Sequence, residues 1–288
     1  METFISAAGL AERLESGERI VLLDVRWALG APDGRAAFAQ GHLPGAVYVD
    51  LESELASHGT PGAGRHPLPD PAEFARAVRR WGVHDGDALV AYDAVGGLSA
   101  ARAWWLLRHA GFTDVSVLDG GLRAWTEAGR PLEAGAVRPE AGNAAPGWGV
   151  MPVIDIDEAA AWPGRGVLLD ARAGGRYRGE AEPVDPRRGH IPGALNLPAA
   201  ECLDDAGRLL PRDVLCGRVA GLGAVGGPTA AYCGSGVTAA FLVAVLDHLG
   251  EEASLFPGSW SQWSADATRE AATGTEGGAP DPRAHTTD

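Results

Sequence analysis

A single cysteine stands in a short glycine-rich turn between two apolar runs, and its chemistry depends on what surrounds it. The stretch reads AYCGSGVTAAF over residues 231–241, and the cysteine is Cys233. The glycines at positions 234 and 236 permit backbone conformations that other residues rarely adopt. A thiol in this setting could be a buried structural group, a metal ligand or a nucleophile.

The residues around Cys233 predict a strand that leads into the turn and a helix that leaves it. The apolar PTAAY segment is typical of a buried strand, and the helix is expected to start near Val237. Such turns lie at the edge of an open α/β sheet where ligands bind, and the helix N-terminus adds partial positive charge there. These features favour a thiolate, and the hydroxyls of Ser235 and Thr238 are within reach of a sulfur or an anionic oxygen. The backbone N–H groups that could converge above the turn belong to Gly234, Ser235, Gly236, Val237 and Thr238.

Three other cysteine chemistries do not fit the spacing. Metal ligands are typically two or four residues apart, whereas Cys202, Cys216 and Cys233 are separated by 14 and 17 residues. A cysteine phosphatase would, by its family pattern, carry an arginine six positions after the cysteine, where this chain has Ala239. A Cys–His dyad has no obvious partner, because His248 lies at the far end of the same predicted helix, about 22 Å away. A nucleophile and a buried structural thiol are the interpretations that stay open.

An internal repeat places this turn in the second of two similar halves. Four blocks recur in the same order at a separation of about 140–148 residues, which indicates a duplicated domain. The position that matches Cys233 in the first half is Asp93, which suggests one working site and one inactive copy. The paired blocks are 21–26 with 167–172, 41–50 with 189–198, 89–111 with 229–250, and 118–125 with 256–263.

Short apolar runs alternate with longer helical stretches in both halves. RIVLLDV and DALVAY are typical of buried parallel strands, and DPAEFARAVRRWG and VTAAFLVAVLDHLG are typical of helices. The sequence therefore predicts an α/β fold of two tandem duplicated domains, each a mainly parallel sheet flanked by helices. The predicted boundaries are 1–134 for the first domain, 135–152 for a Pro- and Gly-rich linker, 153–265 for the second domain and 266–288 for a disordered tail.

Composition and charge limit the partners of the chain. Its 288 residues carry a net charge of −14, which argues against nucleic acid and anionic membranes as partners. No apolar run approaches the roughly 18–20 residues of a membrane span. The first residues lack the features of a signal peptide, so a cytoplasmic setting is expected. Three cysteines leave an odd thiol and argue against a disulfide framework.

The motifs resemble those of two-domain rhodanese-type sulfurtransferases. The resemblance covers about residues 5–264, and it is carried by GHLPGA and GHIPGA, LLDVR and LLDAR, YCGSGVTA, LDGGLRAW and PGSWSQW. It implies a catalytic second domain in which Cys233 carries a persulfide, and a first domain whose equivalent loop is inactive. It also implies that the chain needs no metal and no organic cofactor.

The resemblance further implies a substrate. The uncharged CGSGVT loop is similar to that of 3-mercaptopyruvate sulfurtransferases, whereas thiosulfate enzymes tend to carry basic residues just after the cysteine. The expected reaction moves sulfur from 3-mercaptopyruvate through Cys233 to a thiophilic acceptor such as cyanide, a thiol or thioredoxin, and releases pyruvate. The alternatives are a thiosulfate:cyanide sulfurtransferase and a persulfide carrier that delivers sulfur to a partner protein.

Site residues can be carried over from the family by position. By this match, Arg176 and Arg187 bind the substrate carboxylate, each through a planar guanidinium. The mercaptopyruvate members also imply a relay of Asp50, His66 and Ser235 that helps to move a proton from the substrate thiol. The loop residues expected to bind substrate are Gly234, Gly236, Val237 and Thr238.

Residues that recur in both halves are expected to be structural, because only one half is expected to be active. Arg172 mirrors Arg26, and His190 mirrors His42 in the turn before PGA. Cys202 and Cys216 fall in no motif that can be matched, so they are expected to be incidental.

Overall fold

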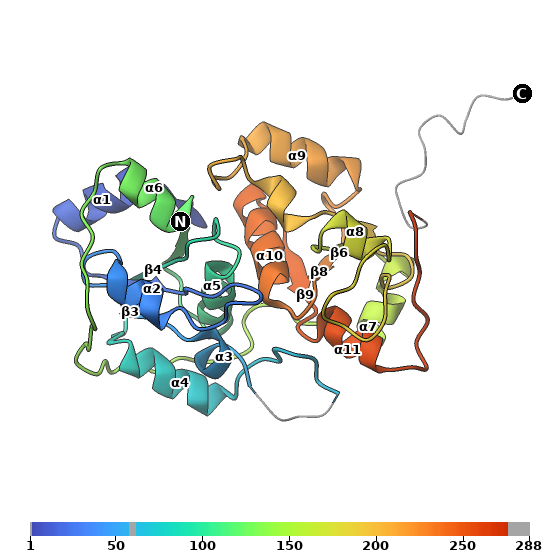
Figure 1. Cartoon of the computed structure of the whole chain (residues 1–288), viewed down its shortest axis with the longest axis horizontal. Helices are drawn as coiled ribbons and strands as arrows, with labels where there is room; N and C mark the ends of the chain where they lie inside the picture. The colour runs from blue at the N-terminus through green and yellow to red at the C-terminus, as the bar shows by residue number, and fades with distance from the viewer. Residues whose placement is uncertain (1, 58–61, 276–288) are drawn as a thin grey trace, which may run out of the picture.

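The computed structural model describes residues 2–57 and 62–275, and it consists of two α/β units side by side (Figure 1). One parallel sheet runs in the order β1-β5-β4-β2-β3 and the other in the order β7-β6-β8-β9. The first sheet is formed by β1 (Phe4–Ile5), β2 (Ile20–Asp24), β3 (Val47–Tyr48), β4 (Ala88–Tyr92) and β5 (Val115–Leu118). The second is formed by β6 (Val167–Asp170), β7 (Leu195–Asn196), β8 (Thr229–Tyr232) and β9 (Ala253–Leu255). The predicted α/β fold with two duplicated domains is confirmed.

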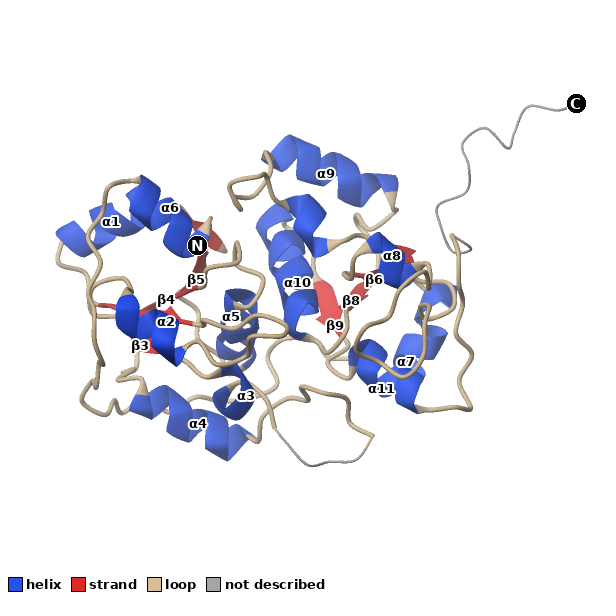
Figure 2. Cartoon of the chain, in the orientation of Figure 1, coloured by secondary structure: helices blue, strands red, loops and turns tan. Residues whose placement is uncertain are grey.

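Helices surround each sheet, as Figure 2 shows in blue around the red strands. Those of the first unit are α1 (Ala7–Glu15), α2 (Arg35–Gln40), α3 (Leu51–Glu54), α4 (Pro71–Arg80), α5 (Ala100–His109) and α6 (Gly121–Glu127). The second unit has α7 (Ile156–Ala161), η1 (Trp162–Gly164), α8 (Gly174–Tyr177), η2 (Ala199–Cys202), α9 (Arg212–Gly221), α10 (Val237–Leu249) and α11 (Ser259–Ala265). None of the helices in the described part of the chain combines the length and the apolar character that crossing a membrane requires.

The two sheets have the same register at residues that the repeat aligns. Asp24 pairs with Tyr92 across β2 and β4, and Asp170 pairs with Tyr232 across β6 and β8. All of these strands are parallel, so their carboxyl ends meet at one edge of each sheet. The residue after each tyrosine, Asp93 or Cys233, therefore starts a strand-to-helix turn at the edge where ligands bind.

The interface between the units is a shared apolar core. Helices α5 and α10 lie next to each other in the middle of the molecule (Figure 1), and residues from both belong to one continuous buried cluster. The ring of Phe4 meets that of Phe241 edge to face, with centroids 5.9 Å apart. Because apolar burial is the main favourable term in such an interface, it holds the two strand-to-helix edges in a fixed relation. The turn at Cys233 consequently faces residues of the first unit.

The predicted linker, 135–152, lies along the first unit rather than between the units. The N–H of Gly142 donates to the carbonyl of Arg79 at 2.8 Å, and the N–H of Gly147 donates to that of Ala110 at 2.8 Å. Ala144 is fully buried in the core. The domain boundaries themselves, 1–134 and 153–265, stay predictions.

The expectation of a disordered tail over 266–288 is wrong for its first ten residues. The N–H of Ala272 donates to the carbonyl of His190 at 2.9 Å, and the N–H of Gly274 donates to that of Arg178 at 2.9 Å. These hydrogen bonds satisfy backbone groups that a polar composition alone does not reveal. The rest of the predicted tail, 276–288, lies outside the described residues.

Candidate active site

Strand β8 delivers Cys233 to a buried turn in which its sulfur accepts a backbone hydrogen bond. The residue is only 3% exposed, and Sγ accepts from the N–H of Gly236 at 3.2 Å. Helix α10 begins at the next residue, Val237, so its N-terminus points toward the sulfur side of the turn. The N–H group and the helix terminus both favour negative charge on sulfur, as the sequence predicts.

The two glycines of the turn are needed for different reasons. Gly236 has a φ of +80°, and an added Cβ would lie 2.5 Å from the carbonyl oxygen of Pro257. Gly234 is not in the left-handed region, so the prediction of an unusual backbone conformation is wrong for this residue. An added Cβ there would instead lie 3.2 Å from Nη2 of Arg65 and 3.5 Å from Nη1 of Arg176. Gly234 therefore leaves room for two guanidinium groups beside the cysteine.

The PGSW segment, residues 257–260, runs into the start of α11 and supports the cysteine turn through hydrogen bonds. The N–H of Cys233 donates to Oγ of Ser259 at 3.1 Å, and the N–H of Trp260 donates to the carbonyl of Cys233 at 2.9 Å. Ser259 has a φ of +54°, the one positive value among the described residues other than glycine. Its hydroxyl also donates to the carbonyl of Phe256 at 2.9 Å, which holds this strained conformation in place.

Above the turn lies a cavity of about 410 Å³ between the two units. The first unit contributes an apolar wall of Trp27, Leu29 and Leu98, together with the guanidinium of Arg65. The second unit contributes its arginines and the cysteine turn. The predicted site residues that line the cavity are Arg176, Cys233, Gly234, Ser235, Val237 and Thr238.

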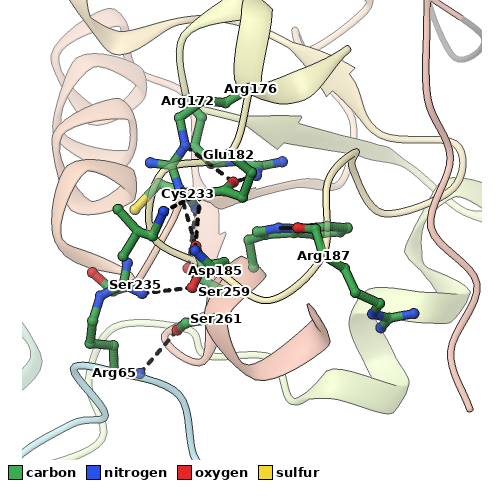
Figure 3. A network of polar contacts seen from close by, with 12 residues as sticks. Arg65, Arg172, Arg176, Glu182, Asp185, Arg187, Cys233, Ser235, Ser259 and Ser261 are labelled. Atoms are coloured by element: carbon green, nitrogen blue, oxygen red, sulfur yellow. Dashed lines mark hydrogen bonds and ion pairs between the residues drawn. The ribbon is translucent and has the colours of Figure 1, made fainter. Parts of the chain in front are cut away.

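Two of the three arginines that line this cavity, Arg65 and Arg176, share a pair of buried carboxylates, Glu182 and Asp185 (Figure 3). Arg176 donates through Nη2 to Glu182 at 2.6 Å and to Asp185 at 3.1 Å. Arg65 donates through Nη1 to Asp185 at 2.6 Å, which joins the two units across the site. Burial would raise the pKa of Glu182, but the hydrogen bonds from Arg176 and from backbone N–H groups hold it below its usual value. The carboxylates therefore orient the guanidiniums and leave N–H groups for an anion in the cavity.

Arg187 does not belong to this cluster, and its predicted role in substrate binding is wrong. Figure 3 shows its guanidinium pointing away from Cys233. It donates to the carbonyls of Trp263 at 2.7 Å and Ser264 at 2.8 Å, and to those of Asp266 and Arg269 at 2.6 Å each. The end of a helix leaves carbonyl groups without partners, and Arg187 satisfies those of α11.

Two members of the relay that the family match predicts, His66 and Ser235, are hydrogen-bonded to each other, but the carboxylate at the histidine is a different one. His66 is buried, its Nδ1 lies 2.7 Å from Oγ of Ser235, and its Nε2 lies 3.1 Å from Oε1 of Glu52. Asp50, predicted as the acidic member, instead caps α3 by accepting from the N–H of Ser53 at 3.2 Å, and it pairs with Arg35. An N-cap side chain is committed to the first turn of its helix, whereas Glu52 lies within the helix and reaches the histidine.

The contacts of His66 define which nitrogen carries the proton. Glu52 can only accept when ionised, and it also accepts from Nε1 of Trp27 at 2.7 Å, so Nε2 of His66 is the protonated nitrogen. Nδ1 then accepts from the hydroxyl of Ser235. Burial lowers the pKa of His66, Glu52 opposes the shift, and the charges of Arg102 and Arg65 add to it. His66 is therefore neutral at neutral pH and able to take a proton through Ser235.

The matching turn in the first unit holds its own anion. The carboxylate of Asp93 accepts from the N–H groups of Val95, Gly97 and Ser99 at 2.8 Å each and from that of Ala100 at 2.9 Å. Asp93 is fully buried. This turn is a cradle of N–H groups that its own side chain fills, so it has no room for a substrate.

Residues repeated in both units make structural contacts. Arg172 and Arg26 each donate to the aspartate two positions before them, at 2.6 Å for the shortest contact, and to a glycine carbonyl. His42 and His190 stack on aromatic rings, with centroids 3.9 and 3.8 Å apart. Burial raises the pKa of the Cys202 thiol to about 12, which disfavours a reactive thiolate there.

The site contains two groups that the sequence analysis missed, Glu52 and Arg65. Glu52 lies two residues after the aspartate that was chosen, and Arg65 directly precedes His66. The proximity of Arg65 to the predicted relay histidine was the available signal. Its approach to Cys233 depends on how the two units pack, which no local pattern contains.

Comparison with known proteins agrees with this architecture. The family model described as a rhodanese-like domain matches residues 6–128 and 155–266. This chain belongs to the rhodanese family. The resemblance to two-domain rhodanese-type sulfurtransferases is thereby confirmed, and the two matched segments correspond to the two sheets of the structure.

Rhodanese relatives match nearly the whole chain. A protein of Mycobacterium tuberculosis named putative thiosulfate sulfurtransferase SseB is 46% identical, over 95% of this chain and 98% of the relative. A probable 3-mercaptopyruvate sulfurtransferase of Pseudomonas aeruginosa is 42% identical, over 94% of this chain and 98% of the relative. The crystal structure of SseA from Escherichia coli, a 3-mercaptopyruvate sulfotransferase by its description, matches with a TM-score of 0.80 and 36% identity, covering 91% of this chain and all of SseA.

Proposed function

We propose that this rhodanese transfers sulfur from 3-mercaptopyruvate, through a persulfide on Cys233, to a thiophilic acceptor, and releases pyruvate. The observation that carries the proposal is the set of groups around one cavity: the Cys233 thiol, the hydroxyl of Ser235, and the guanidiniums of Arg65 and Arg176. A small α-keto acid has one carboxylate for the guanidiniums and one carbonyl for the hydroxyl. The names of relatives that match more than nine-tenths of the chain support the same reaction.

The first half-reaction balances without any added oxidant or reductant. The Cys233 thiolate attacks the sulfur of the donor, so an S–S bond forms while the C–S bond breaks. The electron pair of that bond goes to the departing carbon, which leaves as the enolate of pyruvate. One proton must reach that carbon, and the donor thiol supplies one, since the persulfide is left as an anion.

The hydrogen-bonded chain of Ser235, His66 and Glu52 is suited to move this proton. The neutral imidazole accepts at Nδ1 from Ser235, and Glu52 stabilises the imidazolium that forms when a proton is taken up. The Ser235 hydroxyl lines the cavity, where it can also donate to the donor carbonyl and polarise it. A base of this kind assists a donor that carries a thiol proton, such as 3-mercaptopyruvate. Thiosulfate has no thiol proton, so a base is not needed for it.

The donor carboxylate is assigned to Arg65 and Arg176. Their Nη2 and Nη1 groups flank the open position beside Gly234, and their side chains are 29% and 17% exposed. The carboxylates behind them are almost completely buried, with exposures of 2% for Asp185 and 1% for Glu182. The positive ends of these pairs therefore face the cavity, and an anion that enters gains charge-assisted hydrogen bonds.

In the second half-reaction an acceptor takes the outer sulfur from the Cys233 persulfide. Cyanide would leave as thiocyanate and regenerate the thiolate, and a thiol or thioredoxin would take the same atom. The N–H of Gly236 and the N-terminus of α10 stabilise negative charge on sulfur in both half-reactions.

A thiosulfate:cyanide sulfurtransferase is the second candidate, because the 46% identical relative of M. tuberculosis has that name as a putative activity. The same fold and nucleophile would serve, and the two cavity arginines could hold a sulfonate. A persulfide carrier is the third candidate, and its mark would be a stable persulfide that is released slowly unless a partner protein is added.

The deciding experiment measures turnover of both donors with cyanide as acceptor, together with the mass of the protein after each donor. We expect kcat/KM to be higher for 3-mercaptopyruvate than for thiosulfate, and Cys233 to gain the mass of one sulfur atom. Cys233→Ser should abolish turnover, whereas the matched control Cys216→Ser should keep it. Retained activity in Cys233→Ser would rule out the nucleophile, and faster turnover of thiosulfate would favour the second candidate.

A further inference from the structure

Arg102 is a completely buried arginine at the joint between the two units. It projects from α5 of the first unit and is 0% exposed. Its guanidinium donates to the carbonyls of His66 at 2.9 Å, Leu55 at 3.2 Å and Gly236 at 3.2 Å, with a longer contact of 3.4 Å to that of Pro67. One side chain thus ties the relay histidine of the first unit to the cysteine turn of the second.

The charge of Arg102 has no counter-ion among the described residues, since every partner of its guanidinium is a neutral carbonyl. Every ion pair at the substrate arginines, by contrast, includes a carboxylate. A buried cation is costly unless it is paired, because desolvation removes its water without replacing the opposite charge. Burial lowers the pKa of Arg102 to about 10, so the guanidinium still carries its charge at neutral pH.

The guanidinium of Arg102 donates to the carbonyl of Gly236, and the N–H of that same residue donates to Sγ of Cys233, so the arginine lies against the cysteine turn. A negative charge on the Cys233 sulfur opposes the burial that lowers the pKa of Arg102. The two histidines that feel the charge of Arg102, His66 and His109, have lowered pKa values, chiefly because they are buried. They are neutral at neutral pH and do not compensate the arginine.

We propose that Arg102 is a positioning residue with two roles. Its charge is the fixed counter-ion of the Cys233 thiolate and persulfide, and the N–H groups of its guanidinium hold the carbonyls of His66 and Gly236 in place. The carbonyl that it holds belongs to the same residue whose N–H donates to Sγ. The inference rests on the proposed function for the identity of the nucleophile and does not depend on which donor is used.

Other charges also surround the cysteine, and the test has to separate them from Arg102. On the cavity side they are Arg65, Arg172, Arg176, Glu182 and Asp185, and behind Ser235 they are His66 and Glu52. The cavity arginines are paired with carboxylates, so substitution of Arg102 removes the unpaired charge and leaves those ion pairs in place.

The experiment measures the rate at which iodoacetamide alkylates Cys233 as a function of pH, with the site of modification read from peptide masses. Alkylation reports the thiolate and needs no sulfur donor, so its outcome is separate from that of the proposed function. The first variant is Arg102→Met, which removes the charge and has a side chain of similar size. The second is Arg102→Lys, which keeps the charge but cannot donate to several carbonyls as the guanidinium does. Arg108→Met is the matched control, because Arg108 lies on the same helix and donates to the carbonyl of Thr113 instead.

We expect Arg102→Met to raise the pH midpoint of alkylation by about one unit, equivalent to a tenfold lower thiolate population at pH values below the midpoint. Arg102→Lys should keep the midpoint of the parent protein yet lower kcat for persulfide formation at least about tenfold, because His66 and the turn are no longer held together. Arg108→Met should change neither quantity.

An unchanged midpoint in folded Arg102→Met would overturn the charge role, and an unchanged kcat in Arg102→Lys would overturn the positioning role. If circular dichroism shows that Arg102→Met is unfolded, Arg102→Gln provides a neutral replacement that keeps a donor. A midpoint raised by a full unit in Arg102→Lys would also refute the assignment, because that variant retains the positive charge.

Discussion

Replacement of Glu52 by glutamine tests whether this side chain, rather than Asp50, completes the proton relay. Glu52 accepts from Nε2 of His66 at 3.1 Å and from Nε1 of Trp27 at 2.7 Å. Glutamine has nearly the same shape but no charge, and its amide nitrogen cannot accept from either donor. The imidazolium that forms when His66 takes a proton would lose its stabilising carboxylate.

The expected loss follows from this geometry. General acid–base catalysis contributes about 10²–10⁴-fold to a rate, and a group that acts through the imidazole accounts for the lower part of that range. We therefore expect kcat for persulfide formation from 3-mercaptopyruvate to fall about 100-fold, which corresponds to about 2.7 kcal/mol. The KM should change little, because the cavity arginines are untouched.

The structure also predicts the direction in which the pH profile of kcat moves in Glu52→Gln. Protonation of His66 removes the acceptor for the Ser235 hydroxyl, so kcat should fall on the acidic side of its profile. The Glu52 carboxylate raises the pKa of His66 against the larger lowering effect of burial. Removal of that charge lowers the pKa further, and the acidic limb of the profile should move to lower pH in Glu52→Gln.

Single-turnover kinetics of persulfide formation between pH 5 and 9 would measure both effects. The matched control is Asp50→Ala, which removes the N-cap of α3 and should cost about 1 kcal/mol of stability without moving the acidic limb. A full rate in Glu52→Gln, combined with a lost rate in a folded Asp50→Ala, would refute the assignment. An acidic limb that moved to higher pH would refute the electrostatic reasoning.

Three further predictions concern the turns and the residues that support them. Asp93→Ala leaves four backbone N–H groups without an acceptor, so the free energy of unfolding of the first unit, measured in urea, should fall by about 4 kcal/mol. A decrease below about 1 kcal/mol would contradict the role of Asp93 as acceptor for these groups. Gly236→Ala should destroy the cysteine turn, because the new Cβ would clash with a backbone oxygen. Gly234→Ala should fold and raise the KM for the donor, because its Cβ would approach the two guanidiniums. Equal KM values for the parent protein and Gly234→Ala would contradict the assignment of the donor carboxylate to Arg65 and Arg176. Arg187→Met should lower the melting temperature and leave KM unchanged, and a raised KM at unchanged stability would restore its predicted role in binding.

The turn at Cys233 could be predicted from sequence because its determinants are local. An apolar strand, a glycine that must adopt a positive φ and a helix start lie within a few residues of one another, and the repeat supplies an internal comparison in Asp93. Fold class followed from the same pattern, since strands that alternate with helices leave few arrangements.

The rest of the site depends on which side chains are already occupied by other contacts. Asp50 and Glu52 are both acidic and two residues apart, and only the N-cap geometry shows that the first is committed to its helix. Arg187 lies in an arginine-rich loop, but the carbonyls that it satisfies come from a helix about 75 residues further along the chain. Residue type gives the chemistry of a side chain, and tertiary packing determines which one is free to use it.

The turn at Asp93 helps to explain how the turn at Cys233 is built. The carboxyl group of Asp93 accepts all four N–H groups of its cradle, so the first turn is complete without a ligand. In the second turn Cys233 stands in the place of Asp93, and a cavity lies beside it. The first unit supplies Glu52, His66 and Arg65 to the cavity of the second, together with the buried charge of Arg102. We therefore expect the first unit to be needed for turnover, and a second unit expressed alone should keep the thiol and lose most of the rate.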